Sequence, residues 1–236
     1  MTGKRTTALN KTVDRDKVYS IAEAVKLVKQ NAKAKFNETI DVAVSLGVDV
    51  KQSDQNIRGM LALPHGTGKS VRVAVMARGP KAEEAKKAGA DVVGENDLAD
   101  AILAGNINFD RLIATPDLMP LVGKLGKVLG PKGMMPNPKL GTVTMDVTKA
   151  VNEAKSGAIE YRAEKAGIVH CGIAKASMSE AEITANLNAL MDALVRAKPA
   201  ASKGVYMKKA TLSSTQGPGV KIDISAYASA TATKAA

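Results

Sequence analysis

The sequence predicts an α/β protein of two domains, one of which interrupts the other. Three observations support this prediction. Between residues 71 and 156, short β-branched runs alternate with helical patterns, which is typical of a doubly wound α/β domain. Both ends of the chain carry strands and helices of an α+β type, with strands that alternate apolar and polar residues. Hydrophobic residues make up 45% of the 236 residues, which is enough for compact cores.

The N-terminal stretch predicts an arm, a helix and two strands. Residues 1–16 are charged and poor in large apolar side chains, so we expect an exposed arm. Ser20, with Glu23 three residues later, has the pattern of a helix capping box, and the apolar residues that follow recur at helical spacing. Residues 39–48 alternate apolar and polar, which predicts a half-buried strand. A second strand is expected over 57–63.

The middle of the chain predicts a small parallel sheet flanked by helices. Strands are expected over residues 71–77, 90–94, 111–114 and 143–145, and helices over 80–88, 96–104, 115–129 and 146–156. Strands that alternate with helices imply right-handed parallel crossovers. The pattern changes back after Gly157, where strands are expected over 159–164, 167–173, 208–214 and 220–225. Ser179 and Glu182 form a second capping-box pattern before a helix that runs to residue 198.

The order of these patterns predicts the domain boundaries. Residues 1–66 and 158–226 would form one discontinuous domain, residues 67–157 the inserted domain, and residues 227–236 a disordered tail rich in Ala and Thr. The chain would then cross between the domains twice, which makes a two-stranded hinge. The predicted hinge residues are Pro64, Gly66, Gly68 and Gly157.

The charge balance predicts a polyanionic partner. The chain has 34 Lys and Arg against 23 Asp and Glu, a formal charge of +11. The predicted discontinuous domain carries +8 of this charge and the insert +3. Aromatic residues make up only 3%, so stacking of many unpaired bases is not expected. Recognition should instead depend on phosphate, ribose and nucleic-acid shape.

Several function classes lose support from the composition. Cys171 is the only cysteine, so no internal disulfide can form. The two histidines, His65 and His170, are far apart in sequence and cannot supply a structural zinc site, and we expect no metal and no cofactor. Neighbouring His170 and Cys171 would point to opposite faces of a strand, so they form no nucleophile–base pair. No apolar run is long enough for a membrane span, and we expect a cytoplasmic protein.

The alternative to a binding protein is a nucleotide-binding α/β enzyme. Residues 66–70, Gly-Thr-Gly-Lys-Ser, resemble the end of a phosphate-binding loop, but Leu63 stands where the signature needs glycine. A strand, rather than a helix, is expected directly after them. The turn after the first strand of the insert has one glycine, Gly79, and lacks the dinucleotide fingerprint. We therefore expect no enzyme. A basic nucleic-acid chaperone without sequence preference is a third possibility.

The stretch from Leu118 to Met145 contains lysines and no acidic residue. Its glycines allow close backbone approach, and its prolines stiffen the chain. A run of like charges is usually a solvated surface, but lysines in an ordered Gly/Pro loop also suit a polyanion. The candidate contacts in this lysine loop are Lys124, Lys127, Lys132 and Lys139.

Several longer blocks resemble the large-subunit ribosomal protein L1 family, in its bacterial form. The resemblance runs from about Asp14 to Ile224. It rests on the lysine loop and on residues 34–39 (AKFNET), 53–59 (SDQNIRG), 63–69 (LPHGTGK), 114–117 (ATPD), 165–170 (KAGIVH) and 215–219 (TQGPG). It implies a discontinuous split β-α-β domain with an inserted three-layer Rossmann-like domain. It also implies a protein of the ribosome, monomeric when free, with three RNA partners: large-subunit rRNA at the lateral stalk, exit-site tRNA during translocation, and its own operon mRNA, whose translation it represses.

The resemblance also implies which residues contact RNA. These are Lys35, Phe36, Glu38, Thr39, Lys165, His170, Ser213, Thr215 and Gly217. Phe36 could instead be a core residue at a helix end, His170 an ordinary sheet histidine, and Thr215 and Gly217 simple turn residues. The chain departs from the family pattern at three positions: Gln216 stands for a usual methionine, Val50 for a usual proline, and Cys171 with Gly172 for larger apolar residues.

Overall fold

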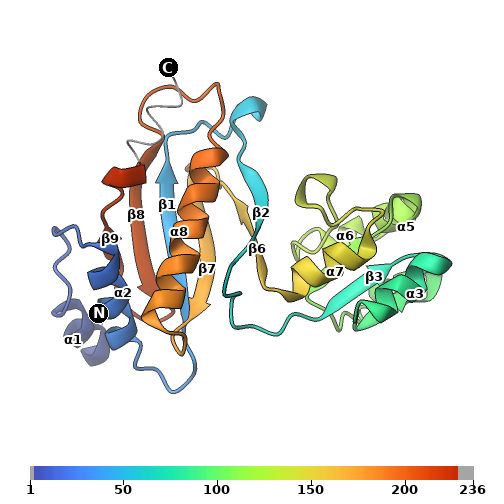
Figure 1. Cartoon of the computed structure of the whole chain (residues 1–236), viewed down its shortest axis with the longest axis horizontal. Coiled ribbons are helices and arrows are strands. Elements are labelled where there is room, and N and C mark those ends of the chain that lie inside the picture. The colour runs from blue at the N-terminus through green and yellow to red at the C-terminus, as the bar shows by residue number, and fades with distance from the viewer. Residues whose placement is uncertain (1–2, 228–236) are drawn as a thin grey trace. The chain divides into compact units, whose positions relative to one another are not determined.

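The computed structural model describes residues 3–227 (Figure 1). The chain divides into two compact units: residues 1–68 with 159–236, and residues 69–158. The predicted tail, 227–236, lies outside the described residues except for Tyr227. Tyr227 is helical and its hydroxyl donates to Asn188 Oδ1 at 2.9 Å, so this residue belongs to the discontinuous unit and not to a tail.

A four-stranded antiparallel sheet forms the centre of the discontinuous unit. Its strand order is β7-β1-β8-β9, with bounds Ile168–Lys175 for β7, Thr39–Leu46 for β1, Met207–Ser214 for β8 and Val220–Ile222 for β9. Side chains of β1 alternate strictly between half-buried and buried, as the predicted period of two requires. The buried set, Ile40, Val42, Val44 and Leu46, faces the core.

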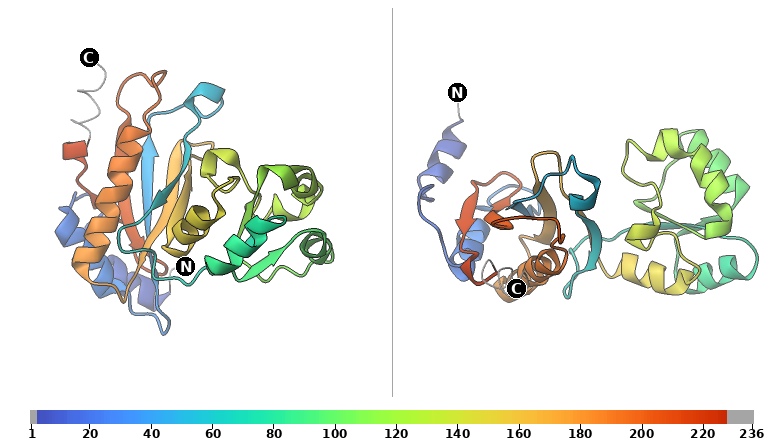
Figure 2. Two further views of the ribbon diagram at one scale, coloured as in Figure 1. Left: turned by 45° about the vertical axis from the view of Figure 1, so that its right-hand side comes forward. Right: turned by 90° about the horizontal axis from the view of Figure 1, so that it is seen from above.

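Two helices cover the core face of this sheet, as Figures 1 and 2 show for α2 (Ile21–Asn31) and α8 (Glu180–Arg196). Both begin with the predicted capping box. The Ser20 hydroxyl accepts from Glu23 N and the Ser179 hydroxyl from Glu182 N, each at 3.3 Å. Each box satisfies amide groups that the first helical turn leaves unpaired. The opposite face of the sheet, which we call the open face, points away from these two helices.

The remaining strands of this unit form a separate pair. The strands expected over 159–164 and 167–173, joined by the turn Lys165–Ala166, are β6 (Ala158–Arg162) and β7, with that turn between them. β6 pairs with β2 (Arg58–Ala62), and β7 pairs with β1. A single bridge, Ala163 with Val169, closes the turn. Across the β2–β6 pair, Arg58 Nη2 lies 2.8 Å from Glu160 Oε1.

Most of residues 3–16 are exposed, as predicted, but the segment is helical in part and is anchored to the unit. Residues Lys4–Asn10 form helix α1, and both Leu9 and Val13 are buried. The Thr12 hydroxyl lies 3.1 Å from Asn31 Oδ1, which ties this segment to the end of α2. Two apolar residues spaced four apart gave too weak a periodic signal to predict a helix among so many charges.

The second unit is a three-layer α/β fold, in agreement with the predicted fold class. Its parallel sheet has the order β4-β3-β5. The strands are β3 (Val73–Met76), β4 (Val92–Gly94) and β5 (Arg111–Ala114), and the helices are α3 (Pro80–Lys87), α4 (Asn96–Leu103), α5 (Met119–Lys124), α6 (Gly126–Leu129) and α7 (Val147–Lys155). Every residue of β3 is buried, because α3 and α7 pack on one face and α4, α5 and α6 on the other.

Two predicted elements of the insert differ in detail from the expectation. The helix expected over 115–129, with interruptions at Gly123 and Gly126, is a 3₁₀ turn, Pro116–Leu118, followed by α5 and α6, which are separated at Leu125. The expected strand over 143–145 is reduced to one parallel bridge between Val143 and Ala114. Three-residue 3₁₀ segments also occur at Ser53–Gln55 and Pro138–Leu140.

The predicted hinge residues differ in how firmly they are held. Asn186 of α8 is fully buried, and its side chain donates to Gly66 O at 2.8 Å and accepts from His65 N at 3.2 Å. Gly66, Gly68 and Gly157 have positive φ angles of 62°, 68° and 86°, which glycine adopts without strain. The Asn186 contacts fasten the Pro64–Gly66 turn to α8. A hinge at Pro64, Gly66, Gly68 and Gly157 stays a prediction.

We expect Asn186→Ala to destabilise the discontinuous unit by about 2–3 kcal/mol. The substitution leaves buried backbone groups near Gly66 and Ile173 without their partner, at a cost of roughly 1–3 kcal/mol per group. Urea unfolding measures the effect. The matched control is Asn188→Ala on the same helix, which loses the single bond to Tyr227 and should cost about 1 kcal/mol or less. Equal costs for the two variants would contradict the anchoring role of Asn186.

Candidate nucleic-acid interface

Most of the predicted RNA contacts meet at one end of the four-stranded sheet, where β1 begins. Thr39 pairs with Lys175 of β7, and Asp41 lies opposite Ser213 of β8. Antiparallel pairing therefore brings three distant segments together, residues 34–39, 175–177 and 213–217, which we call the loop cluster. Phe36, Glu38, Thr39, Ser213, Thr215 and Gly217 all lie in it.

Thr215 fastens the turn after β8 to the first residue of β1. Its backbone N donates to Thr39 O at 3.0 Å, and its Oγ1 accepts from Thr39 N at 2.9 Å and lies 3.2 Å from Thr39 O. The backbone N–H and the hydroxyl of Thr215 thus form hydrogen bonds within the protein, as expected if Thr215 is simply a turn residue. Glycine is favoured at position 217 for a steric reason, because a Cβ there would collide with the Ser214 hydroxyl. These contacts give the turn a fixed shape.

Glu38 does not lie on the surface, contrary to its predicted role as an RNA contact. It is 1% exposed, and its carboxylate accepts from Ala34 N at 2.8 Å and from Gln216 N at 3.0 Å. Burial alone would raise the pKa of Glu38. The two amide donors and the nearby Arg5 charge outweigh burial and hold the pKa below its usual value. Glu38 is therefore a positioning residue that joins two loops of the cluster.

Arg5 of α1 reaches the same carboxylate and was missed from the sequence. Its guanidinium lies 3.7 Å from Glu38 Oε1, and its Nη1 donates to Gln216 Oε1 at 2.6 Å. Gln216 is one of the departures from the family pattern, and its amide oxygen is what receives Arg5. No short-range pattern could link positions that are 211 residues apart.

Lys175 and its neighbours are a second group that the sequence did not single out. Lys175 Nζ lies 2.9 Å from Thr39 Oγ1, and Asn37 Nδ2 lies 3.0 Å from Ser177 Oγ. The strand register would have indicated Lys175, because a residue opposite Thr39 must share its end of the sheet. Predicting that register requires knowing that β1 pairs with β7.

Phe36 and Lys35 form the outward side of the loop cluster. The Phe36 side chain is 51% exposed, so it is not a core residue at the end of α2. Lys33 and Lys35 are exposed beside it. An exposed ring on a segment that also carries exposed lysines offers a stacking surface together with phosphate-binding charge. The carboxylate of Glu38 is buried inside, so the exterior of residues 33–36 is purely cationic and aromatic.

Lys165 and His170 lie away from the loop cluster. His170 pairs with Ala43 in the middle of β1, and its side chain is exposed with Nε2 3.4 Å from Glu164 Oε1. Lys165 is exposed in the turn before β7, at the opposite end of the sheet from Thr39. Cys171 points to the core, and burial, with a contribution from the charge of Asp41, raises the pKa of its thiol to about 12. That thiol is a poor nucleophile at neutral pH.

The lysine loop belongs to the second unit. Lys124 ends α5, Lys127 lies in α6, and Lys132 follows in the turn after it, and all three are exposed. The backbone of Lys139 lies in the 3₁₀ segment Pro138–Leu140, and its side chain lies outside the described part of the chain. The alternation of lysine with buried Val122, Leu125 and Leu129 places apolar groups inward and charges outward.

The described residues contain no group of three His, Cys, Asp or Glu side chains that could hold a metal ion. None of the described helices has the length and apolar content needed to cross a membrane. The segment after Ser70 leads into strand β3 rather than a helix, as predicted, so the Gly66–Ser70 stretch is not followed by the helix that a phosphate-binding loop requires.

We expect Glu38→Gln to destabilise the protein by about 1–3 kcal/mol at neutral pH, because one buried amide loses its acceptor. The folded protein lowers the pKa of Glu38 below its unfolded value of about 4.3. Its contribution is therefore present above pH ~4.3 and is lost as the pH falls through the lower folded value. Urea unfolding between pH 3 and pH 7 should show the two proteins converging in acid. A constant difference across that range would contradict this role.

A sequence model of the Ribosomal protein L1p/L10e family matches residues 28–218 of the chain. The matched range contains the loop cluster, strands β1, β7 and β8 of the sheet and the whole insert, and it ends before β9. It covers well over half of the 236 residues. The family is a structural ribosomal family and not a family of enzymes, in agreement with the prediction. The chain belongs to the ribosomal protein L1 family and is a protein of the large ribosomal subunit that binds ribosomal RNA.

Proposed function

We propose that the loop cluster is the surface that recognises large-subunit rRNA at the base of the lateral stalk. The observation that carries this proposal is the exposed Phe36 ring beside Lys33 and Lys35, on loops that Glu38 and Thr215 hold in place. A fixed surface binds RNA without first losing the entropy of ordering its loops.

Each part of the loop cluster suits one feature of a folded RNA. Lys33 and Lys35 neutralise phosphates, and Phe36 stacks on a base or ribose. The half-exposed hydroxyls of Thr39 and Ser213 can bond ribose 2′-hydroxyl groups, which distinguish RNA from DNA. Lys165 and His170 would add contacts along the open face. Glu38 acts by positioning, and Gly217 by leaving room beside Ser214.

We propose that the lysine loop of the insert contacts exit-site tRNA and helps it to leave during translocation. Lys124, Lys127 and Lys132 are exposed, and no acidic residue interrupts the segment that carries them. Point charges without an aromatic partner favour a phosphate backbone over specific bases.

We further propose that the free protein is a cytoplasmic monomer that binds its own operon mRNA through the loop cluster and represses its translation. The same fixed surface would serve both RNAs, so the mRNA site must imitate the rRNA site in shape. Competition between the two RNAs for one protein surface follows from this proposal.

We expect Phe36→Ala to weaken binding to a stalk-base rRNA fragment by about 5- to 150-fold, the range for losing one base–aromatic contact of ~1–3 kcal/mol. Binding to random RNA of equal length should change little. Because the ring is half exposed, the free energy of unfolding should stay within about 0.5 kcal/mol. Filter binding and urea unfolding measure these effects.

The matched control is Leu103→Ala, an exposed apolar residue on the insert, which should leave rRNA affinity unchanged. A labelled operon leader should be displaced by the stalk-base fragment, and Phe36→Ala should weaken the binding of both RNAs. If the wild-type protein binds the stalk-base fragment no better than random RNA, the proposed recognition is wrong.

For the lysine loop we expect the triple variant Lys124→Gln, Lys127→Gln and Lys132→Gln to slow the release of deacylated tRNA several-fold, because the charges that attract its phosphates are gone. Stopped-flow dissociation from ribosomes that carry the variant measures the rate. Affinity for the stalk-base fragment should stay close to that of the wild type. An unchanged release rate, with the variant fully incorporated, would count against the tRNA contact.

A further inference from the structure

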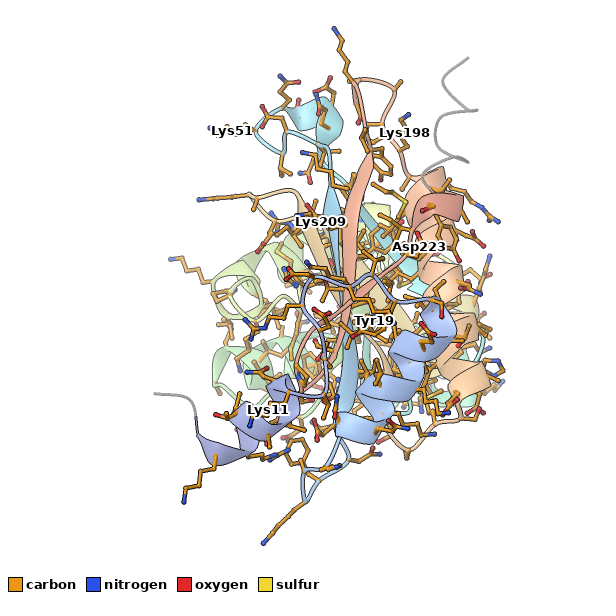
Figure 3. The ribbon with its side chains drawn as sticks, turned by 90° about the vertical axis from the view of Figure 1, so that its left-hand side faces the viewer. Lys11, Tyr19, Lys51, Lys198, Lys209 and Asp223 are labelled. Atoms are coloured by element: carbon orange, nitrogen blue, oxygen red, sulfur yellow. The ribbon has the colours of Figure 1, made fainter. Side chains whose placement is uncertain are left out.

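A lysine-lined hollow lies at the β8–β9 edge of the sheet, apart from the loop cluster. It has a volume of about 350 Å³, and Val18, Ala210, Ile222 and Ile224 contribute apolar lining. Lys208, Lys209 and Lys221 also line it, together with one acidic residue, Asp223. We call this surface the edge patch. Figure 3 views the discontinuous unit from this side and shows Tyr19, Lys209 and Asp223.

A β-bulge brings two of the lysines to one place. Ser45 of β1 pairs with Lys209 while Leu46 pairs with Met207, which leaves Lys208 as the extra residue. Both lysines are exposed, whereas regular alternation would have buried one of them. Lys221 pairs with Thr211, so it stands diagonally across from Lys209 on the neighbouring strand, at roughly 7–8 Å between Cα atoms.

The sheet stops at this point and so leaves the hollow open. β9 pairs only with Ala210–Leu212, and β8 continues past it through Lys209 toward Met207. Beyond β9, Tyr19 forms a single bridge with Ile222. That bridge sets Val18, which is 56% exposed, against the lysines.

The lysines of the edge patch have no acidic partner. Among residues 3–227, Lys208, Lys209 and Lys221 form no ion pair with a carboxylate. Asp223 is engaged elsewhere, since its Oδ1 accepts from both the backbone N and the hydroxyl of Ser225. Lys17, which precedes Val18 of the hollow in sequence, lies 4.9 Å from the centre of the Tyr19 ring. Like charges gathered without a counterion attract a polyanion.

We propose that the edge patch is a second RNA-binding surface of the discontinuous unit, which holds the sugar–phosphate backbone of an RNA strand. Lys209 lies four residues along β8 from Ser213 of the loop cluster, or about 13 Å at ~3.3 Å per residue. One RNA can therefore span both surfaces. Binding of one RNA to both surfaces rests on the proposed role of the loop cluster. The charges of the edge patch do not depend on that role. The hollow contains no aromatic ring, so its binding should be independent of base sequence.

The test is the salt dependence of RNA binding by the full chain with Lys208→Gln, Lys209→Gln and Lys221→Gln. Losing three phosphate contacts should reduce the slope of log K against log [salt] by about 2–3. The control replaces three exposed lysines elsewhere, Lys26, Lys86 and Lys87, by Gln and has the same net charge. It should leave the slope near the wild-type value. A Lys→Arg triple variant at the edge patch should keep the wild-type slope.

Two RNAs separate this proposal from that for the loop cluster. The slope should fall by the same amount on the stalk-base fragment and on an unrelated RNA of equal length, whereas Phe36→Ala acts on the first alone. If wild-type protein shows no preference for the stalk-base fragment, the loop-cluster proposal fails, but the slopes still decide the edge patch. The edge-patch proposal would be overturned by an unchanged slope in the Gln triple variant, or by an equal decrease of the slope in the control variant. That result would leave an acidic protein segment as the partner to examine.

Discussion

The geometry of the loop cluster depends on the buried carboxylate of Glu38. Its two oxygens accept backbone N–H groups from Ala34 and Gln216, and its own carbonyl accepts from Ala176 N. One residue thus connects the segments before β1, after β7 and after β8. A buried charge is tolerated only where hydrogen bonds replace its lost hydration. Because the donors are backbone groups of the loops themselves, satisfying this charge fixes the loops.

The buried carboxylate of Glu38 also separates the negative charge of the site from its positive charges. The negative charge is held inside, next to Arg5 of α1, while Lys33 and Lys35 remain outside. The overall charge of +11 therefore understates how positive the surface is at this point. Gln216 contributes to the same arrangement, since its amide oxygen receives the Arg5 guanidinium that an apolar side chain could not bind. The departure from the family pattern adds a link between α1 and the turn.

Local signals were sufficient for most helices and strands but not for their partners. The capping boxes at Ser20 and Ser179, and the alternation along β1, need only neighbours in sequence, and the structure has each of them. The pairing of β6 with β2, and the burial of Glu38, depend on segments more than 90 residues apart. A glutamate two residues after exposed Phe36 carries no local sign that it points inward. The sequence therefore indicated residues that the fold brings together, but not that Glu38 is buried among them.

The two surfaces of the sheet suit different parts of one task. The loop cluster has fixed backbone, one exposed ring and hydroxyl groups, which favour one RNA shape over others. The edge patch has flexible lysines on a bulge and no ring, which adds attraction without selecting a sequence. Under the two proposals, selectivity and strength vary separately: a change at Phe36 would alter which RNA binds, and a change at Lys209 would alter how strongly any RNA is held. In a chain with only 3% aromatic residues, such a division would allow one ring to be enough for specific binding.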